Sequence, residues 1–172
     1  MEDRAVAATE AFVAFLRGYV RERRARPADD LITQLIAAEM EGEKLSTEEL
    51  IATCILLLNA GHEATVHTIG NGVKTLLETG TPLSALTPGN VEATVEEILR
   101  YDPALHMFTR WAYEDIEVMG HHFQRGDQVG LLLAAANRDP GVWDDPARFN
   151  PARLPKPNAT FGAGLHFCVG AP

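Results

Sequence analysis

The chain has 172 residues, of which 46% are hydrophobic and 23% charged, a balance typical of a globular protein rather than a disordered one. Its 15 basic and 24 acidic residues give a formal net charge of −9, which argues against general binding to nucleic acid or to an anionic membrane. At about 150 residues per domain, we expect one domain over residues 1–172, or a piece of something larger.

The cysteines and the apolar runs indicate the cellular compartment. Cys54 and Cys168 are the two cysteines, too few for a secreted disulfide framework. The N-terminus lacks the pattern of a signal peptide, and the longest apolar run, residues 51–61, is too short to cross a membrane. We therefore expect a cytoplasmic protein that binds neither membrane nor nucleic acid.

The first two predicted elements are helices, of which the first is amphipathic. Residues 5–26 carry apolar side chains at helical spacing and end in a cluster of arginines, which suits the C-terminal end of a helix. A second, short helix is predicted over residues 29–40, with the Asp29-Asp30 pair as its cap and Gly42 as its stop signal.

The third predicted helix is unusually long. Ser46 and Glu49 form a capping-box pattern, and no strong stop signal follows before Gly80. Such a helix is about 50 Å long at 1.5 Å per residue. Its first half is apolar on nearly every side, so we expect its middle, including His62 and Glu63, to be buried.

The remaining pattern predicts one more helix followed by short strands and a long irregular segment. Thr87 and Pro88 are expected to begin the helix, which runs to residue 100. Strands are predicted over residues 108–112, 116–119 and 128–133, and the irregular connection covers residues 137–158.

His62 and Glu63 invite comparison with a zinc protease helix, but the spacing is wrong. The second histidine, His67, is five residues on, and five residues turn a helix by about 140°, so the two rings cannot share one ion. A buried carboxylate at Glu63 is then either paired for structural reasons or placed for proton transfer. The residues alone leave both interpretations open.

Several charged side chains have an ordinary interpretation. Glu97 and Arg100 have the spacing of a surface ion pair on a helix, worth about 0.2–0.5 kcal/mol. Arg110 and Arg148 can equally be surface arginines.

The strongest signal is the segment Phe161-Gly162-Ala163-Gly164-Leu165-His166-Phe167-Cys168-Val169-Gly170. Its glycines allow a tight backbone that could approach a phosphate, but the GK[ST] ending of a nucleotide loop is missing. A structural zinc needs further Cys or His ligands, and only His166 is near. One thiolate from Cys168 suits a metal whose other positions are filled by a macrocycle, which indicates haem.

These residues resemble the cytochrome P-450 haem-thiolate monooxygenases of the bacterial soluble type. Residues 161–170 match the cysteine-ligand loop FGxGxHxCxG, and Glu97-Ile98-Leu99-Arg100 matches ExxR. Residues 146–149 match PxRF, and residues 60–65 are similar to the oxygen-activation segment AGHETT. The resemblance implies a mainly α fold with a minor β region, containing the long central helix, the ExxR helix and the cysteine loop. The chain would be one partial domain, truncated at both ends.

The resemblance also assigns residue roles. It implies Cys168 as the axial iron ligand, His166 and Arg110 as donors to the haem propionates, and Phe161 as a shield beside the sulfur. The further cofactor-binding residues would be Gly162, Gly164, Ala60 and Gly61. Leu105, His106 and Phe108 would contact substrate, and Glu97, Arg100 and Arg148 would form a buried network.

The activity implied is insertion of one oxygen atom of dioxygen into a small apolar organic substrate at haem b. Electrons would come from NAD(P)H through a ferredoxin or flavodoxin-like donor. A non-catalytic truncated remnant and a peroxide-driven haem enzyme are the alternatives.

One position departs from the family pattern. Ala64 stands where most members have a threonine that helps to deliver protons. We therefore hypothesise that Glu63 feeds a water chain anchored by Thr65 or by a substrate hydroxyl, and name Glu63 and Thr65 as candidate catalytic residues.

Overall fold

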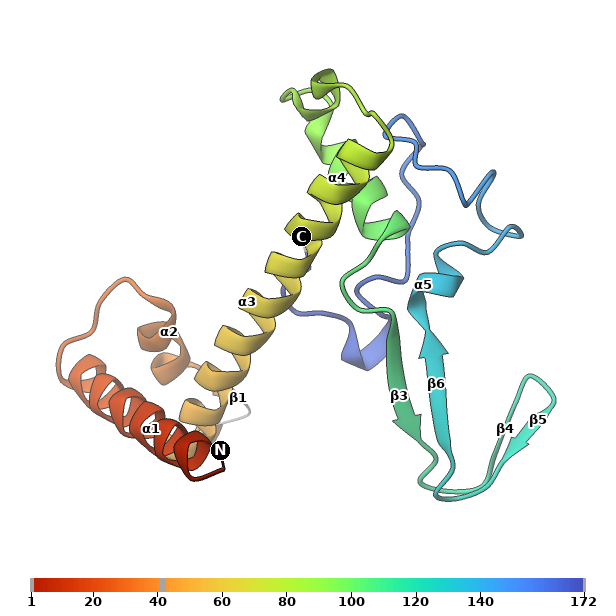
Figure 1. Ribbon diagram of the computed structural model, residues 1–172. Helices are drawn as coiled ribbons and strands as arrows, with labels where there is room; N and C mark the ends of the chain where they lie inside the picture. The colour runs from red at the N-terminus through yellow and green to blue at the C-terminus, as the bar shows by residue number, and fades with distance from the viewer. Residues whose placement is uncertain (1, 41–42, 172) are drawn as a thin grey trace. The chain divides into compact units, whose positions relative to one another are not determined.

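The computed structural model describes residues 2–40 and 43–171, and the chain forms two compact units, Met1–His62 and Glu63–Pro172 (Figure 1). The first unit contains α1 (Glu2–Ala25), α2 (Leu31–Ala37), β1 (Glu39–Met40), β2 (Glu43–Lys44) and the start of α3 (Thr47–Glu78). The second contains the rest of α3, η1 (Leu83–Leu86), α4 (Val91–Tyr101), β3 (Met107–Trp111), β4 (Ile116–Val118), β5 (His121–Phe123), β6 (Gln128–Leu132), α5 (Leu133–Ala136) and η2 (Gly164–His166). The predicted mainly α fold with a minor β region is confirmed.

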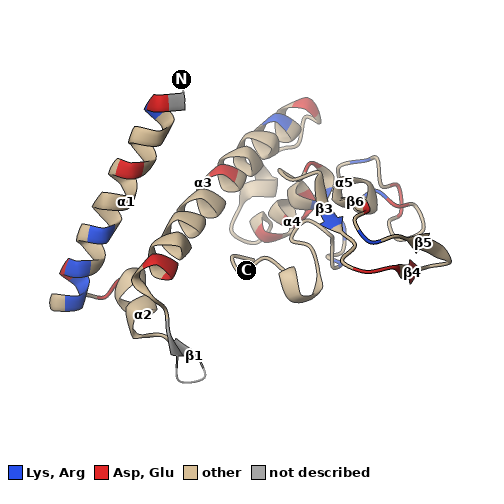
Figure 2. Cartoon of the chain, turned by 90° about the horizontal axis from the view of Figure 1, so that it is seen from below, with Lys and Arg blue, Asp and Glu red and all other residues tan. Residues whose placement is uncertain are grey.

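The first two helices follow the predicted pattern with one correction. α1 carries a cluster of arginines at its C-terminal end (Figure 2), and α2 begins at the predicted cap, where the Asp30 carboxylate accepts a hydrogen bond from the Thr33 amide at 2.8 Å. α2 ends at Ala37 instead of residue 40, because Ala38 is extended and residues 39–40 pair antiparallel with residues 43–44. The predicted stop at Gly42 lies outside the described residues.

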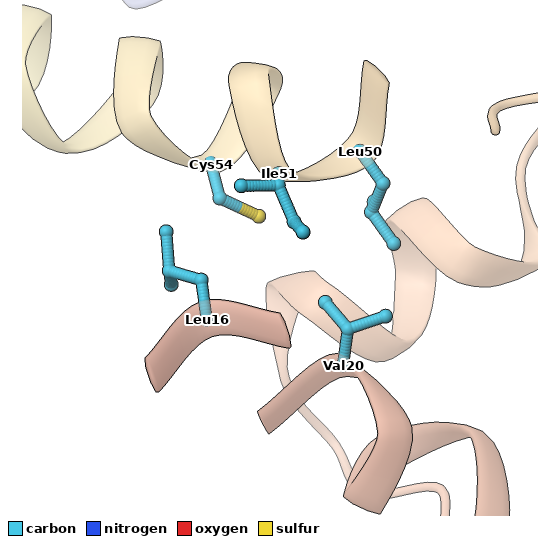
Figure 3. Packing of buried hydrophobic residues seen from close by; sticks show 5 residues of the cluster. All are labelled: Leu16, Val20, Leu50, Ile51 and Cys54. Atoms are coloured by element: carbon cyan, nitrogen blue, oxygen red, sulfur yellow. The ribbon is translucent and has the colours of Figure 1, made fainter. Parts of the chain in front are cut away.

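The core of the first unit joins α1 to the beginning of α3. Leu16 and Val20 of α1 pack with Leu50, Ile51 and Cys54 of α3 (Figure 3). Burying a side chain of this size contributes about 1.5–3 kcal/mol. Burial also raises the pKa of the Cys54 thiol, because the charged thiolate is poorly solvated there.

The cap of α2 makes the stability of this unit depend on pH. Hydrogen bonds from Arg23 and from the Thr33 amide lower the pKa of Asp30 to about 2. Because the folded pKa lies below the ordinary value, the stabilisation is complete above about pH 4 and is lost as the pH falls towards 2.

Asp30→Asn is the substitution that isolates this charge, since the amide oxygen can still cap α2. We expect the variant to unfold at lower urea than the parent at about pH 6, with the difference shrinking as the pH falls to about 2.5. A difference in urea midpoint that is the same at both pH values would show that the Asp30 charge contributes nothing.

The long helix α3 has 32 residues and the predicted N-terminal cap. The Ser46 amide donates to the Glu49 carboxylate at 2.9 Å, and the Glu49 amide donates to the Ser46 hydroxyl at 3.2 Å, which completes the capping box. Hydrogen bonding to the Glu49 carboxylate from the side chain and then from the amide of Ser46 lowers the pKa of Glu49.

The expected burial of the middle of α3 is wrong. Gly61, His62 and Glu63 are all exposed, and the buried side chains of α3 lie nearer its ends, from Leu50 to Cys54 and at Thr75. An apolar helix is buried only where other segments pack on it, and the described residues place none over this stretch. Among those residues, no helix is both long and apolar enough to span a membrane.

The fourth helix begins later than predicted. Thr87 ends η1, its hydroxyl donating to the Ser84 carbonyl at 2.9 Å, and Asn90 precedes the first residue of α4. Thr87 and Pro88 therefore lie in the turn between two helices. A threonine hydroxyl can hydrogen-bond to nearby backbone in such a turn as well as at a helix cap, so the sequence pattern is the same. Gly72 of α3 faces Ile98 of α4, and a Cβ at Gly72 would lie 3.1 Å from the Ile98 side chain.

The strands form antiparallel pairs, β3 with β6 and β4 with β5. Met119 and Gly120 connect β4 to β5 with positive φ angles of 52° and 77°, which is typical of a tight hairpin turn. The prediction missed β5 and the short helix α5, of which only Leu133 falls in a predicted strand. Residues 137–158 are irregular, as predicted.

Candidate functional site

The glycine-rich segment near the C-terminus folds as a closed loop that presents one thiol. The Cys168 amide donates to the Phe161 carbonyl at 3.0 Å, and Gly162 and Gly164 have φ angles of 73° and 70°, which other residues rarely adopt. Cys168 is exposed and unbridged. A Cβ at Gly170 would lie 3.9 Å from the sulfur, in ordinary contact with it.

Apolar residues flank Cys168 along the loop sequence. Leu165 and Val169 are 97% and 91% exposed, Phe167 is exposed, and Phe161 is half-buried. The loop therefore offers a single soft ligand within an apolar surface.

Strand β3 lies beside this loop. A Cβ at Gly162 would lie 3.8 Å from the ring of Phe108, and the Arg110 guanidinium stands 5.8 Å from the centre of that ring. Arg110 is exposed and donates to the Thr109 carbonyl at 2.9 Å. Leu105 and His106, which precede the strand, are also exposed.

A buried ion pair lies on α4. Arg100 donates to both carboxylate oxygens of Glu97, at 2.7 and 2.8 Å, and its guanidinium also donates to the backbone carbonyls of Asn137, Pro146 and Arg148. The Arg100 side chain is 1% exposed. The sequence-based interpretation as a surface pair is therefore wrong, because the carbonyls of the irregular segment close over it.

The second guanidinium of this cluster belongs to Arg153. Its Nε lies 3.2 and 3.3 Å from the two oxygens of Glu97, and it also donates to three backbone carbonyls. Arg148, the predicted third member, contributes its carbonyl to Arg100 and has an exposed side chain. The expected role of the Arg148 side chain is corrected accordingly: Arg153, five residues later, reaches the carboxylate because the backbone turns back towards α4.

Two further polar residues of this region were missed by sequence reasoning. Asn137 and Thr160 are buried and hydrogen-bonded to each other at 2.9 Å. Asn137 begins the irregular segment and Thr160 follows its end, and nothing in their sequence neighbourhood signals the burial that makes them hydrogen-bond partners.

The candidate residues on α3 lie around Glu63, in the middle of an apolar helix. Ala60, Gly61, Glu63 and Thr65 are exposed and Ala64 is half-buried. Glu63 is the only Asp, Glu, Lys or Arg in the sequence between Glu49 and Lys74, as Figure 2 shows for the middle of α3.

The donor set of the cysteine loop fits haem. A porphyrin fills four positions on its iron, so the protein needs to supply one strong axial ligand, and Cys168 is such a ligand on an exposed turn. The apolar residues around it suit the macrocycle, and His166 and Arg110 are exposed groups able to bind propionates.

Comparison with known proteins defines the class. The family model for cytochrome P-450 matches residues 90–172. The chain is 40% identical over 168 residues to the polyketide biosynthesis cytochrome P-450 PksS of Bacillus subtilis, covering 96% of this chain and 42% of that protein. It is 41% identical to the biotin biosynthesis cytochrome P-450 of the same organism, covering 92% and 40%.

Solved structures agree with this assignment. A cytochrome P-450 of Bacillus megaterium in complex with testosterone superposes with a TM-score of 0.94 at 32% identity, covering 99% of this chain and 48% of that one. A cytochrome P-450 in complex with an acyl carrier protein ligated to hexadec-9Z-enoic acid gives a TM-score of 0.84 at 40% identity, covering 92% and 42%. The chain belongs to the cytochrome P-450 family, and it spans about two fifths of the length of the curated relatives it matches.

Proposed function

We propose that this chain provides the cysteine-ligand side of a haem-thiolate monooxygenase. The observation that carries the proposal is the exposed Cys168 thiol on a loop closed by its own amide. Haem bound there would supply dioxygen activation, to which a thiolate ligand contributes electron density.

Other residues of the loop and of β3 orient the haem and shield its sulfur ligand in this proposal. His166 and Arg110 bind the propionates, Phe161 shields the sulfur, and Gly162 and Gly164 allow close approach of the backbone. The resemblance also assigns Ala60 and Gly61 of α3 to cofactor binding, and both are small and exposed. The match to the family motif supports the assignment of the loop residues, and the proximity of the loop to β3 at Phe108 supports that of Arg110.

The substrate in this proposal is a small apolar organic molecule that contacts Leu105, His106 and Phe108. The proposal is supported by the exposed apolar surface of Leu105 and by the apolar ligands in the two solved relatives, a steroid and a protein-bound fatty acid. Electrons come from NAD(P)H through a ferredoxin or flavodoxin-like donor in the same proposal.

The two cysteines provide a matched test of the ligand. Cys168→Ser should abolish the red-shifted Soret band of the reduced carbon monoxide complex in the haem-loaded protein, because serine supplies no thiolate. Cys54→Ser changes a buried thiol of the first unit and should leave the band unchanged. Retention of the band in Cys168→Ser would refute the assignment.

A further inference from the structure

A buried side-chain amide lies between the ion pair and the segment that leads into the cysteine loop. Asn137, which follows α5, is 1% exposed. Its Oδ1 accepts a hydrogen bond from the Ala159 amide at 2.6 Å, and its Nδ2 donates to the Thr160 hydroxyl at 2.9 Å. Asn137 therefore holds two consecutive residues of that segment.

The hydroxyl of Thr160 connects the same point to α4. It accepts from Asn137 and donates to the Leu99 carbonyl at 2.7 Å, so its single proton has a fixed direction. The carbonyl of Asn137 in turn accepts from Arg100 at 2.8 Å. The segment is thereby attached both to α4 and to the guanidinium of the buried ion pair.

The cysteine loop closes on these same residues. The Gly162 amide donates to the Ala159 carbonyl at 2.9 Å, and the Cys168 amide donates to the carbonyl of Phe161 at 3.0 Å. The hydrogen bonds of Asn137 and Thr160, which we call the tether, thus hold residues 159 and 160. The carbonyls of Ala159 and Phe161 accept the two hydrogen bonds that close the loop.

We propose that Asn137 and Thr160 are positioning residues that fix the start of the Cys168 loop and thereby the place of the thiol. The role of the thiol as a ligand rests on the proposed function, whereas the tether itself is defined by the hydrogen bonds. A methyl group in place of the hydroxyl would fill the same volume, but it would leave the Asn137 amide and the Leu99 carbonyl without this partner. Hydrogen bonding, and not packing volume, is the property the position requires.

Thr160→Val and Thr94→Val form a matched pair of variants. Both remove a buried threonine hydroxyl that donates to a backbone carbonyl at 2.7 Å, from Thr94 to Ala85 and from Thr160 to Leu99, but only Thr160 adjoins the loop. In the haem-free chain we expect amide hydrogen exchange at Gly162 and Cys168 to accelerate about tenfold in Thr160→Val and less than about twofold in Thr94→Val. Thr160→Ser, which keeps the hydroxyl, should restore both rates to within about threefold of the parent.

A haem-dependent readout separates this inference from the proposed function. In the haem-loaded protein, Thr160→Val should lower the fraction of iron that shows the thiolate Soret band, and Thr160→Ser should recover it. If the parent binds haem through Cys168 but the Gly162 and Cys168 amides exchange equally in Thr160→Val and Thr94→Val, the tether is refuted and the function stands. If the exchange pattern holds but the parent shows no thiolate band, the tether is supported and the proposed function falls.

A measurement on the parent chain covers the case in which Thr160→Val does not fold. In the parent, the Ala159, Gly162 and Cys168 amides should open together as one cooperative unit. Their exchange rates, corrected for intrinsic differences, should then agree to within about threefold. A protected Ala159 amide beside a freely exchanging Cys168 amide would overturn the proposal.

Discussion

Replacement of Arg100 by alanine should unfold the second unit at a much lower urea concentration than the parent chain. The substitution removes five hydrogen bonds from a guanidinium that is 1% exposed and leaves the buried Glu97 carboxylate with Arg153 as its remaining cationic partner. Loss of one partner from a buried ion pair costs about 3–5 kcal/mol. Trp143, 4% exposed and 5.3 Å from the guanidinium, reports the transition by its fluorescence.

Arg17→Ala is the matched control for this experiment. Arg17 pairs with Glu48 at 2.8 Å, but the two side chains are 47% and 69% exposed, so the loss should be about 0–1 kcal/mol. Arg100→Lys keeps the charge but cannot reproduce the planar set of donors, and we expect it to recover little of the stability. Equal urea midpoints for Arg100→Ala and Arg17→Ala would show that the Arg100–Glu97 pair contributes no more to stability than a surface ion pair.

On the hypothesis that Glu63 delivers protons, its replacement by glutamine should reduce turnover of the haem-loaded enzyme by roughly 100-fold or more, the typical effect of losing a general acid–base group. Glutamine keeps the size and polarity of the side chain but cannot release and recover a proton. Ala64 supplies no hydroxyl at the neighbouring position, so the carboxyl of Glu63 and the hydroxyl of Thr65 are the proton-carrying groups adjacent to it. Slower proton delivery should also divert electrons from product to hydrogen peroxide.

Glu78→Gln is the control for the charge of α3, since Glu78 is an exposed carboxylate at the end of the same helix. The ratio to compare is product formed per NAD(P)H consumed, at equal haem content. Ala64→Thr should leave this ratio unchanged or improve it. A ratio unaffected by Glu63→Gln would leave Glu63 without a role in proton transfer.

Local sequence signals predicted those elements whose ends are set by local chemistry. The capping box at Ser46 and Glu49 and the cap at Asp30 are hydrogen-bonded as their spacing indicates. The start of α4 was misplaced because Thr87 uses its hydroxyl within a turn instead of at a helix end.

The features that the sequence could not predict depend on contacts distant along the chain. Nothing near Arg153 distinguishes it from other arginines, since its contact with Glu97 joins residues 56 positions apart. The exposure of Glu63 likewise depends on which segments pack on α3, which no helical pattern contains. The cysteine loop is recognisable because the family motif that it matches is a continuous stretch of ten residues, 161–170.

Iron X-ray absorption on the haem-loaded protein tests the central claim most directly. Cys168 as the axial ligand predicts one sulfur atom in the first coordination sphere of the iron in the parent and in Cys54→Ser, and none in Cys168→Ser. A coordination sphere of nitrogen and oxygen alone in the parent would contradict the assignment of Cys168 as the ligand.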